Sequence, residues 1–101
     1  MLWGGTRMMK LPINYDKSSS VLRRQAREQY VELQKGLCYH CKQLLKGQPS
    51  SDVLRYNINW KLFPDTFRNY PVHLHHCHKT GMTIGAVHNY CNAYLWQYCG
   101  E

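Results

Sequence analysis

The feature that most constrains this chain is a concentration of histidine and cysteine in one short stretch. Residues 72–92 read VHLHHCHKTGMTIGAVHNYCN and hold five of the six histidines. Two further thiols stand upstream, in the sequence CYHC at 38–41. Histidine and cysteine are common ligands of soft and borderline metal ions, and so dense a run is not typical of core packing alone. We therefore expect metal binding to organise the fold.

The spacing of these residues predicts one structural zinc site. A C-x-x-C pair can bind one ion from a single turn, and an H-x-x-C pair in the other half of the chain can complete a closed tetrahedral set. His40 is not expected to bind, because two ligands already come from its turn. The alternative is that the cysteines are free and buried, which accounts for the paired spacing less well. The predicted zinc ligands are Cys38, Cys41, His88 and Cys91.

Length and charge bound the class of protein. A chain of 101 residues is expected to form one domain with a modest core, for which a metal ion is a natural supplement. Thirteen Lys and Arg against six Asp and Glu give a net charge of +7, which favours a polyanionic partner, nucleic acid before an anionic membrane surface. The simpler alternative is a basic protein whose charge only aids solubility.

The cysteine count and the hydropathy pattern indicate a compartment. Five cysteines is an odd number that fits a complete set of disulfides poorly, whereas metal ligation fits a reducing compartment. We see neither a signal peptide nor an apolar run of the roughly 18 to 20 residues that a membrane span needs. The expected protein is soluble, intracellular and cytoplasmic, with no membrane partner.

The first part of the chain predicts an arm followed by a helix. Residues 1–17 are expected to be an irregular arm, and residues 18–101 a single domain. Apolar residues at helical spacing, without Pro or Gly, predict a helix over 21–35, with an N-cap among the serines at 18–20. Its Arg23, Arg24 and Arg27 form either a basic stripe facing phosphates or an ordinary solvated face.

The second part predicts an insertion and then a ββα unit. Residues 47–71 form the insertion; within it, apolar residues alternate over 54–60 and favour a short strand. Its aromatic residues could stack on bases, although filling a small core is the simpler interpretation. Strands over 72–76 and 82–87, joined by a turn, are expected to precede a helix over 89–98. The fold class is therefore α+β.

A second group of polar side chains falls within the ββα unit. Successive helical residues lie about 100° apart, so if Cys91 faces zinc, Asn92 can point back across the strands. There it would meet His75, His76 and His78. An imidazole and an amide oxygen can hold a divalent ion such as Mg²⁺, and a neighbouring imidazole can take a proton from water. Because a regular strand puts His75 and His76 on opposite faces, this arrangement requires a bend.

These pieces together resemble the HNH (ββα-metal) endonucleases, and most of all the zinc-containing branch typified by phage recombination endonuclease VII. That branch pairs C-x-x-C with a D-H-x-H-x-x-G run and a later C-x-x-C-N. The corresponding segments here are 38–41, 75–81 and 88–92. The resemblance covers roughly residues 20 to 98, without 47–71. It implies a zinc-stapled domain with an HNH core preceded by one helix.

The resemblance also implies roles for single residues. His76 would be the general base that activates water, and His75 and Asn92 would bind the catalytic divalent ion. His78 would assist by orienting groups or contacting a phosphate. The zinc ligands would be the four named above.

Two departures from the family pattern affect these roles. His75 stands where the family usually has aspartate, and a nitrogen ligand shifts the preference from Mg²⁺ toward Mn²⁺, Ni²⁺ or Zn²⁺. His88 replaces the third zinc cysteine, which is chemically conservative. Cys77 and Cys99 are expected to be small buried residues, and His73 a surface or supporting group.

The expected function is hydrolysis of DNA phosphodiester bonds by an intracellular, phage-encoded enzyme that could act as a homodimer. One alternative is a non-catalytic, zinc-stabilised nucleic-acid-binding module; another is a protein that binds other proteins. The residues expected to contact DNA are Arg23, Arg24, Arg27 and Lys79.

Overall fold

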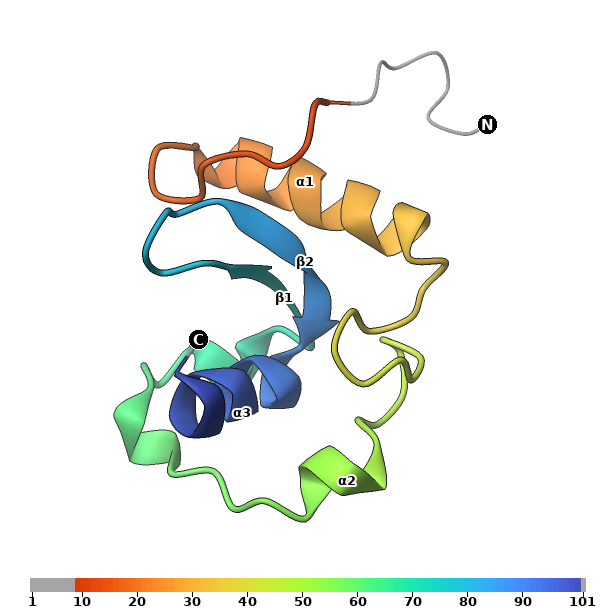
Figure 1. Ribbon diagram of the computed structural model, residues 1–101, viewed down its shortest axis with the longest axis vertical. Coiled ribbons are helices and arrows are strands. Elements are labelled where there is room, and N and C mark those ends of the chain that lie inside the picture. The colour runs from red at the N-terminus through yellow and green to blue at the C-terminus, as the bar shows by residue number, and fades with distance from the viewer. Residues whose placement is uncertain (1–8, 101) are drawn as a thin grey trace.

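The computed structural model describes residues 9–100, so residues 1–8 of the expected arm and Glu101 lie outside it. The described chain is α+β, as predicted, with a two-stranded antiparallel sheet and helices. Figure 1 shows the sheet between two helices that cover it from different sides. The elements in order are α1 (Ser20–Leu33), α2 (Ser51–Leu54), the 3-10 turns η1 (Trp60–Leu62) and η2 (Phe67–Asn69), β1 (Val72–His76), β2 (Thr83–His88) and α3 (Asn89–Cys99).

The first helix begins at a serine cap, as predicted. The Ser19 hydroxyl accepts a hydrogen bond from the backbone N–H of Leu22 at 3.2 Å, which satisfies one of the N–H groups left open at a helix start. The buried positions of α1 are Ala26 and Gln29, whereas Leu22 is 42% exposed. Small and amide side chains therefore bring α1 close to the sheet.

The two strands pair as expected, but with an irregularity at the end of β1. Val72 lies opposite His88, and the register continues regularly to His75 opposite Gly85. His76 then lies opposite Thr83, so the register shifts between His75 and His76. The extra residue of this irregularity is Ile84 on β2, which has no partner on β1. A bulge bends the strand that carries the extra residue, here β2. The bend of β1 that would bring His75 and His76 to one site stays a prediction.

Within residues 9–100, the outer edge of β2 is covered by the Gln34 side chain and the backbone of Tyr39 rather than by a third strand. The Gln34 carboxamide accepts from the N–H of Ala86 at 2.8 Å and donates to its carbonyl oxygen at 2.9 Å. The N–H of Tyr39 donates to the same carbonyl at 2.9 Å. A Cβ atom at Gly85 would lie 2.8 Å from Gln34 Oε1 and 2.9 Å from the Tyr39 ring, so glycine is required for this close approach.

The strand predicted over 54–60 is wrong. This segment follows α2 and runs into η1, and its backbone is satisfied by side chains of α3. The hydroxyls of Tyr90 and Tyr98 donate to the carbonyl oxygens of Tyr56 and Asn57, each at 2.5 Å. Side chains of α3 thus make the hydrogen bonds that a neighbouring strand would make, and the alternating residues do not form a strand. Its aromatic rings pack on α3 instead, as Tyr56 does on Tyr94 at 4.9 Å between centroids.

The hydrophobic core of the described residues lies where the C-x-x-C turn, β2 and α3 meet. Its largest fully buried side chains are Val87, Cys38 and Cys91. Two of these three are predicted metal ligands, so the metal centre and the core coincide. Within residues 9–100, no helix combines the length and the hydrophobicity that crossing a membrane would need.

Candidate metal centre and adjoining cleft

Four side chains converge at the junction of the C-x-x-C turn with β2 and α3. Their ligand atoms all lie within 4.8 Å of one another, and three of the four residues are buried. His88 Nδ1 lies 3.5 Å from Cys41 Sγ and 3.6 Å from Cys91 Sγ. Tetrahedral bonds of about 2.3 Å to sulfur and 2.0 Å to nitrogen would separate such atoms by roughly 3.5 Å. The four predicted ligands thus form a Cys₃His group that could hold a structural metal such as zinc: Cys38, Cys41, His88 and Cys91.

The surroundings of the group suit a metal site. His88 Nε2 lies 2.8 Å from the carbonyl oxygen of Leu44, which can only accept, so Nε2 carries the proton and Nδ1 offers its lone pair to the centre. The N–H of Cys41 points at Cys38 Sγ from 3.5 Å. Hydrogen bonds from Cys91 and from backbone N–H groups lower the pKa of Cys38 to about 4, against the opposing effect of burial. The same contact with Cys38, together with burial, raises the pKa of Cys91.

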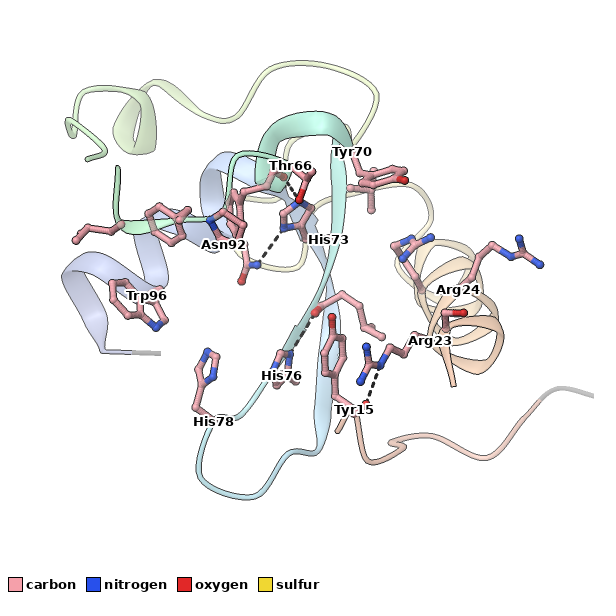
Figure 2. Close-up of a pocket in the computed structure, with 18 of the residues that line it drawn as sticks. Tyr15, Arg23, Arg24, Thr66, Tyr70, His73, His76, His78, Asn92 and Trp96 are labelled. Atoms are coloured by element: carbon pink, nitrogen blue, oxygen red, sulfur yellow. Dashed lines mark hydrogen bonds between the residues drawn. The ribbon is translucent and has the colours of Figure 1, made fainter. Parts of the chain in front are cut away.

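Asn92, in the first turn of α3, links two histidine rings of β1. His73 Nε2–H donates to the carbonyl oxygen of Phe67 at 2.8 Å, so His73 Nδ1 is an acceptor. It accepts from Asn92 Nδ2 at 3.1 Å, as Figure 2 shows. Asn92 Oδ1 is then left to accept from Nδ1–H of His75 at 3.2 Å. One chain of hydrogen bonds therefore fixes the amide orientation and both tautomers.

His76, at the end of β1, occupies a different environment from His75. Its ring is stacked on Tyr15, with 3.9 Å between centroids and 5° between planes. His78 lies on the turn beyond, with 4.8 Å between the His78 and His76 centroids. Burial, followed by the proximity of His78 and His75, lowers the pKa of His76 and favours the neutral ring that a base requires.

A cleft of about 820 Å³ opens beside these histidines. One wall is the arginine-bearing face of α1, and the opposite wall carries aromatic residues that include Trp96 (Figure 2). The wall of α1 supplies positive charge, and the aromatic wall supplies flat apolar surface. The charged and polar lining includes Arg23, Arg24, Arg27, His73, His76, His78 and Asn92.

Not every predicted site residue reaches the cleft. His75 is 2% exposed and lies behind Asn92, which does line the cleft. Lys79 is exposed on the turn between the strands and is not part of the lining. The expectation that Cys99 is buried is wrong, because it is exposed at the end of α3, and Cys77 is only half-buried. Cys99 is the last residue of α3, at the exposed end of that helix.

One residue of the site was missed from the sequence, and another has a supporting role of the kind expected. His73, expected to be a surface or supporting group, accepts a hydrogen bond from the Asn92 amide. Its place two residues before His75, on the same strand face, was the one signal in the sequence. Tyr15 lies in the arm that was expected to be irregular, and no local pattern links it to His76.

Comparison with known proteins does not assign a family. No family model matches the sequence, and neither the curated proteins nor the solved structures give a significant match. The function must therefore be argued from the residues and their geometry.

Proposed function

We propose that this chain is a metal-dependent DNA endonuclease of the HNH type, with His76 as the general base and His75 and Asn92 as ligands of a catalytic divalent ion. A structural zinc ion would occupy the Cys₃His group. The order β1, β2, α3 corresponds to the ββα order of that family. The Cys₃His residues correspond to the zinc ligands of the family's sequence pattern. These observations support the proposal without any likeness of the whole sequence.

The observation that carries the proposal is the distance of 3.2 Å between His75 Nδ1 and Asn92 Oδ1. Two ligand atoms in adjacent positions of an octahedral ion, with bonds near 2.1 Å, lie about 3 Å apart. The same two atoms could therefore exchange their mutual hydrogen bond for an ion with little movement. His75 would first have to move its proton from Nδ1 to Nε2. An ion there would stabilise the charge that develops on the phosphate and on the leaving oxygen.

His76 is suited to the proton transfer. Its Nδ1 lies 3.5 Å from the carbonyl oxygen of Leu74, at the outer limit of a hydrogen bond, and a proton on Nδ1 would leave the lone pair on Nε2. A lowered pKa keeps this ring neutral at pH 7. In the proposed reaction Nε2 takes a proton from water, the water oxygen attacks phosphorus, and the bond to the leaving oxygen of the sugar breaks.

The cleft supports DNA as the substrate. Arg23, Arg24 and Arg27 line it opposite the aromatic wall and beside His76 and His78. A guanidinium group can bind phosphate through two parallel hydrogen bonds, and the net charge of +7 favours a polyanion. We propose that the phosphate backbone lies along α1, with the reacting phosphate at the histidines. His78 would contact a neighbouring phosphate.

The second candidate is a non-catalytic, zinc-stabilised nucleic-acid-binding module. The burial of His75 favours it, because a ligand behind Asn92 is further from a bound phosphate than a cleft-lining one. This candidate leaves the chain of hydrogen bonds through Asn92 without a function.

Incubation of supercoiled plasmid with the zinc-loaded protein separates the two candidates. We expect nicked or linear DNA with Mg²⁺, Mn²⁺ or Ni²⁺, and intact DNA in buffer free of these ions; chelators are avoided because they would remove zinc. The variant His76→Ala should lose cleavage by roughly 100-fold or more while keeping zinc. His40→Ala is the matched control, because His40 contacts Tyr94 and does not line the cleft. DNA binding without cleavage under every ion would support the binding module instead.

A further inference from the structure

We propose that Tyr15 is a positioning residue for His76, and that the part of the arm around Tyr15 belongs to the active site. The inference rests on the proposed function, because it assigns Tyr15 a role through the general base. It concerns a residue outside the ββα unit. The face-to-face stack of the Tyr15 and His76 rings carries it.

The contact is specific in its geometry. The two ring planes differ by 5°, and the centroids are 3.9 Å apart. On the other face of Tyr15, the guanidinium carbon of Arg23 lies 4.0 Å from the ring centroid. Figure 2 shows Tyr15 between His76 and Arg23 at the edge of the cleft. The order imidazole, phenol, guanidinium joins β1, the arm and α1 in one stack.

Tyr15 is held in place independently of His76. Its backbone N–H donates to the carbonyl oxygen of Gly81 at 2.7 Å, and its own carbonyl oxygen accepts from Arg23 Nε at 2.8 Å. The neighbouring Asn14 pairs with Met82 as an isolated β-bridge. Residues 14–15 are thus fixed to the turn between the strands and to α1. Because the backbone of Tyr15 is anchored at these points, its ring can hold a stacked partner in one orientation.

His76 needs such a partner. Its Nδ1 hydrogen bond to Leu74 is 3.5 Å long, at the outer limit of such bonds, and does not by itself fix the ring. The register shift between His75 and His76 leaves His76 opposite Thr83 at the end of β1, where the regular pairing of the strand stops. A flat aromatic surface on one face prevents the imidazole from tilting, and leaves both ring nitrogens accessible at the edge. Tyr15 therefore holds Nε2 in line with the cleft.

The consequence for catalysis is a loss of alignment when the stack is removed. Displacing a catalytic group by about 1 Å can lower the rate on the order of 100-fold. The stack uses the face of the Tyr15 ring and the backbone of the arm, so phenylalanine preserves it and leucine does not. A role of the hydroxyl would lower the rate equally in both variants, because neither phenylalanine nor leucine carries it.

The test compares Tyr15→Leu with Tyr15→Phe in the zinc-loaded, full-length protein. Single-turnover plasmid cleavage at saturating DNA should fall roughly 10- to 100-fold for Tyr15→Leu, while Tyr15→Phe retains most of the wild-type rate. Zinc content and the thermal midpoint are measured for both variants. Equal loss in the two variants, or full activity of Tyr15→Leu, would overturn the proposal.

A second measurement does not depend on activity. In NMR spectra of the wild-type protein, ring protons of His76 should show contacts to the Tyr15 ring and be shifted upfield by its ring current. Tyr15→Phe should keep that shift. Absence of these contacts in the wild-type protein would overturn the proposal even if cleavage is confirmed. If the contacts are present but the protein does not cleave DNA, the proposed function is wrong. The stack of Tyr15 on His76 is then a structural contact without a catalytic role.

Discussion

His88 donates its Nε2–H to the carbonyl oxygen of Leu44 over 2.8 Å. This one contact selects the tautomer whose Nδ1 lone pair faces the three thiols. Partners of this kind hold a metal-binding imidazole in orientation, and their loss typically costs 10- to 100-fold in metal affinity. Leu44 contributes only its backbone carbonyl oxygen, so the residue type at that position does not predict the contact.

The first prediction concerns zinc. The Cys₃His group lies within the core, so metal binding and folding should be linked. We expect Cys38→Ser to lose stoichiometric zinc and cooperative thermal unfolding. Cys99→Ser is the control, because Cys99 is exposed and outside the group, and it should keep both. Metal analysis and circular dichroism measure the outcome; one zinc per chain in a stable Cys38→Ser variant would contradict it.

The second prediction concerns the close approach at β2. A Cβ atom added at Gly85 would lie 2.8 Å from Gln34 Oε1, which accepts a hydrogen bond from the N–H of Ala86. We expect Gly85→Ala to lower the free energy of unfolding by roughly 1–3 kcal/mol in urea titration. A Cβ atom at Gly47 meets its nearest neighbour at 3.6 Å, so Gly47→Ala should stay within about 0.5 kcal/mol. Similar losses for both variants would show that the contact is not the cause.

Short-range signals predicted much of this fold. The serine cap, the two strands and the last helix follow from patterns local in sequence, and their bounds agree within one or two residues. The four members of the Cys₃His group were also predicted, because two pairs at ligand spacing are typical of a tetrahedral metal site. In each of these cases the signal lies in residues that are close together in the sequence.

Contacts between distant segments were not predicted. The strand expected over 54–60 failed because α3 side chains bond its backbone, which depends on where α3 lies in space. Tyr15 reaches His76 across 61 residues of sequence, and nothing near Tyr15 indicates a partner. The register shift between His75 and His76 was not predicted, since register depends on both strands.

The third prediction concerns the titration of His73. Burial, and secondarily the positive charge of Arg27, lower the pKa of His73 below its ordinary value of about 6.5. The unfolded chain therefore binds more protons just below pH 6.5. The contribution of His73 to stability should rise with pH through that window and be level above it.

NMR titration of the zinc-loaded protein tests this directly. We expect the His73 ring to titrate below pH 6.5, and Arg27→Gln to move its pKa upward because a repelling charge is removed. His76 serves as an internal reference, because Arg27 does not contribute to its shift. An unchanged pKa of His73 in the Arg27→Gln variant would mean that burial, and not the charge of Arg27, lowers that pKa.

The fourth prediction concerns the arginine wall of the cleft. Arg24 is exposed and lines the cleft, so it can contact a phosphate without disturbing the stack on Tyr15. Each phosphate contact adds about 0.9 to the slope of log K against log salt for duplex DNA. We expect Arg24→Gln to reduce that slope by about this amount, measured by fluorescence anisotropy without added divalent ions. Lys46→Gln removes the same charge at an exposed position outside the cleft and should leave the slope unchanged. Equal reductions in both variants would mean that overall charge, rather than the wall of α1, binds the DNA.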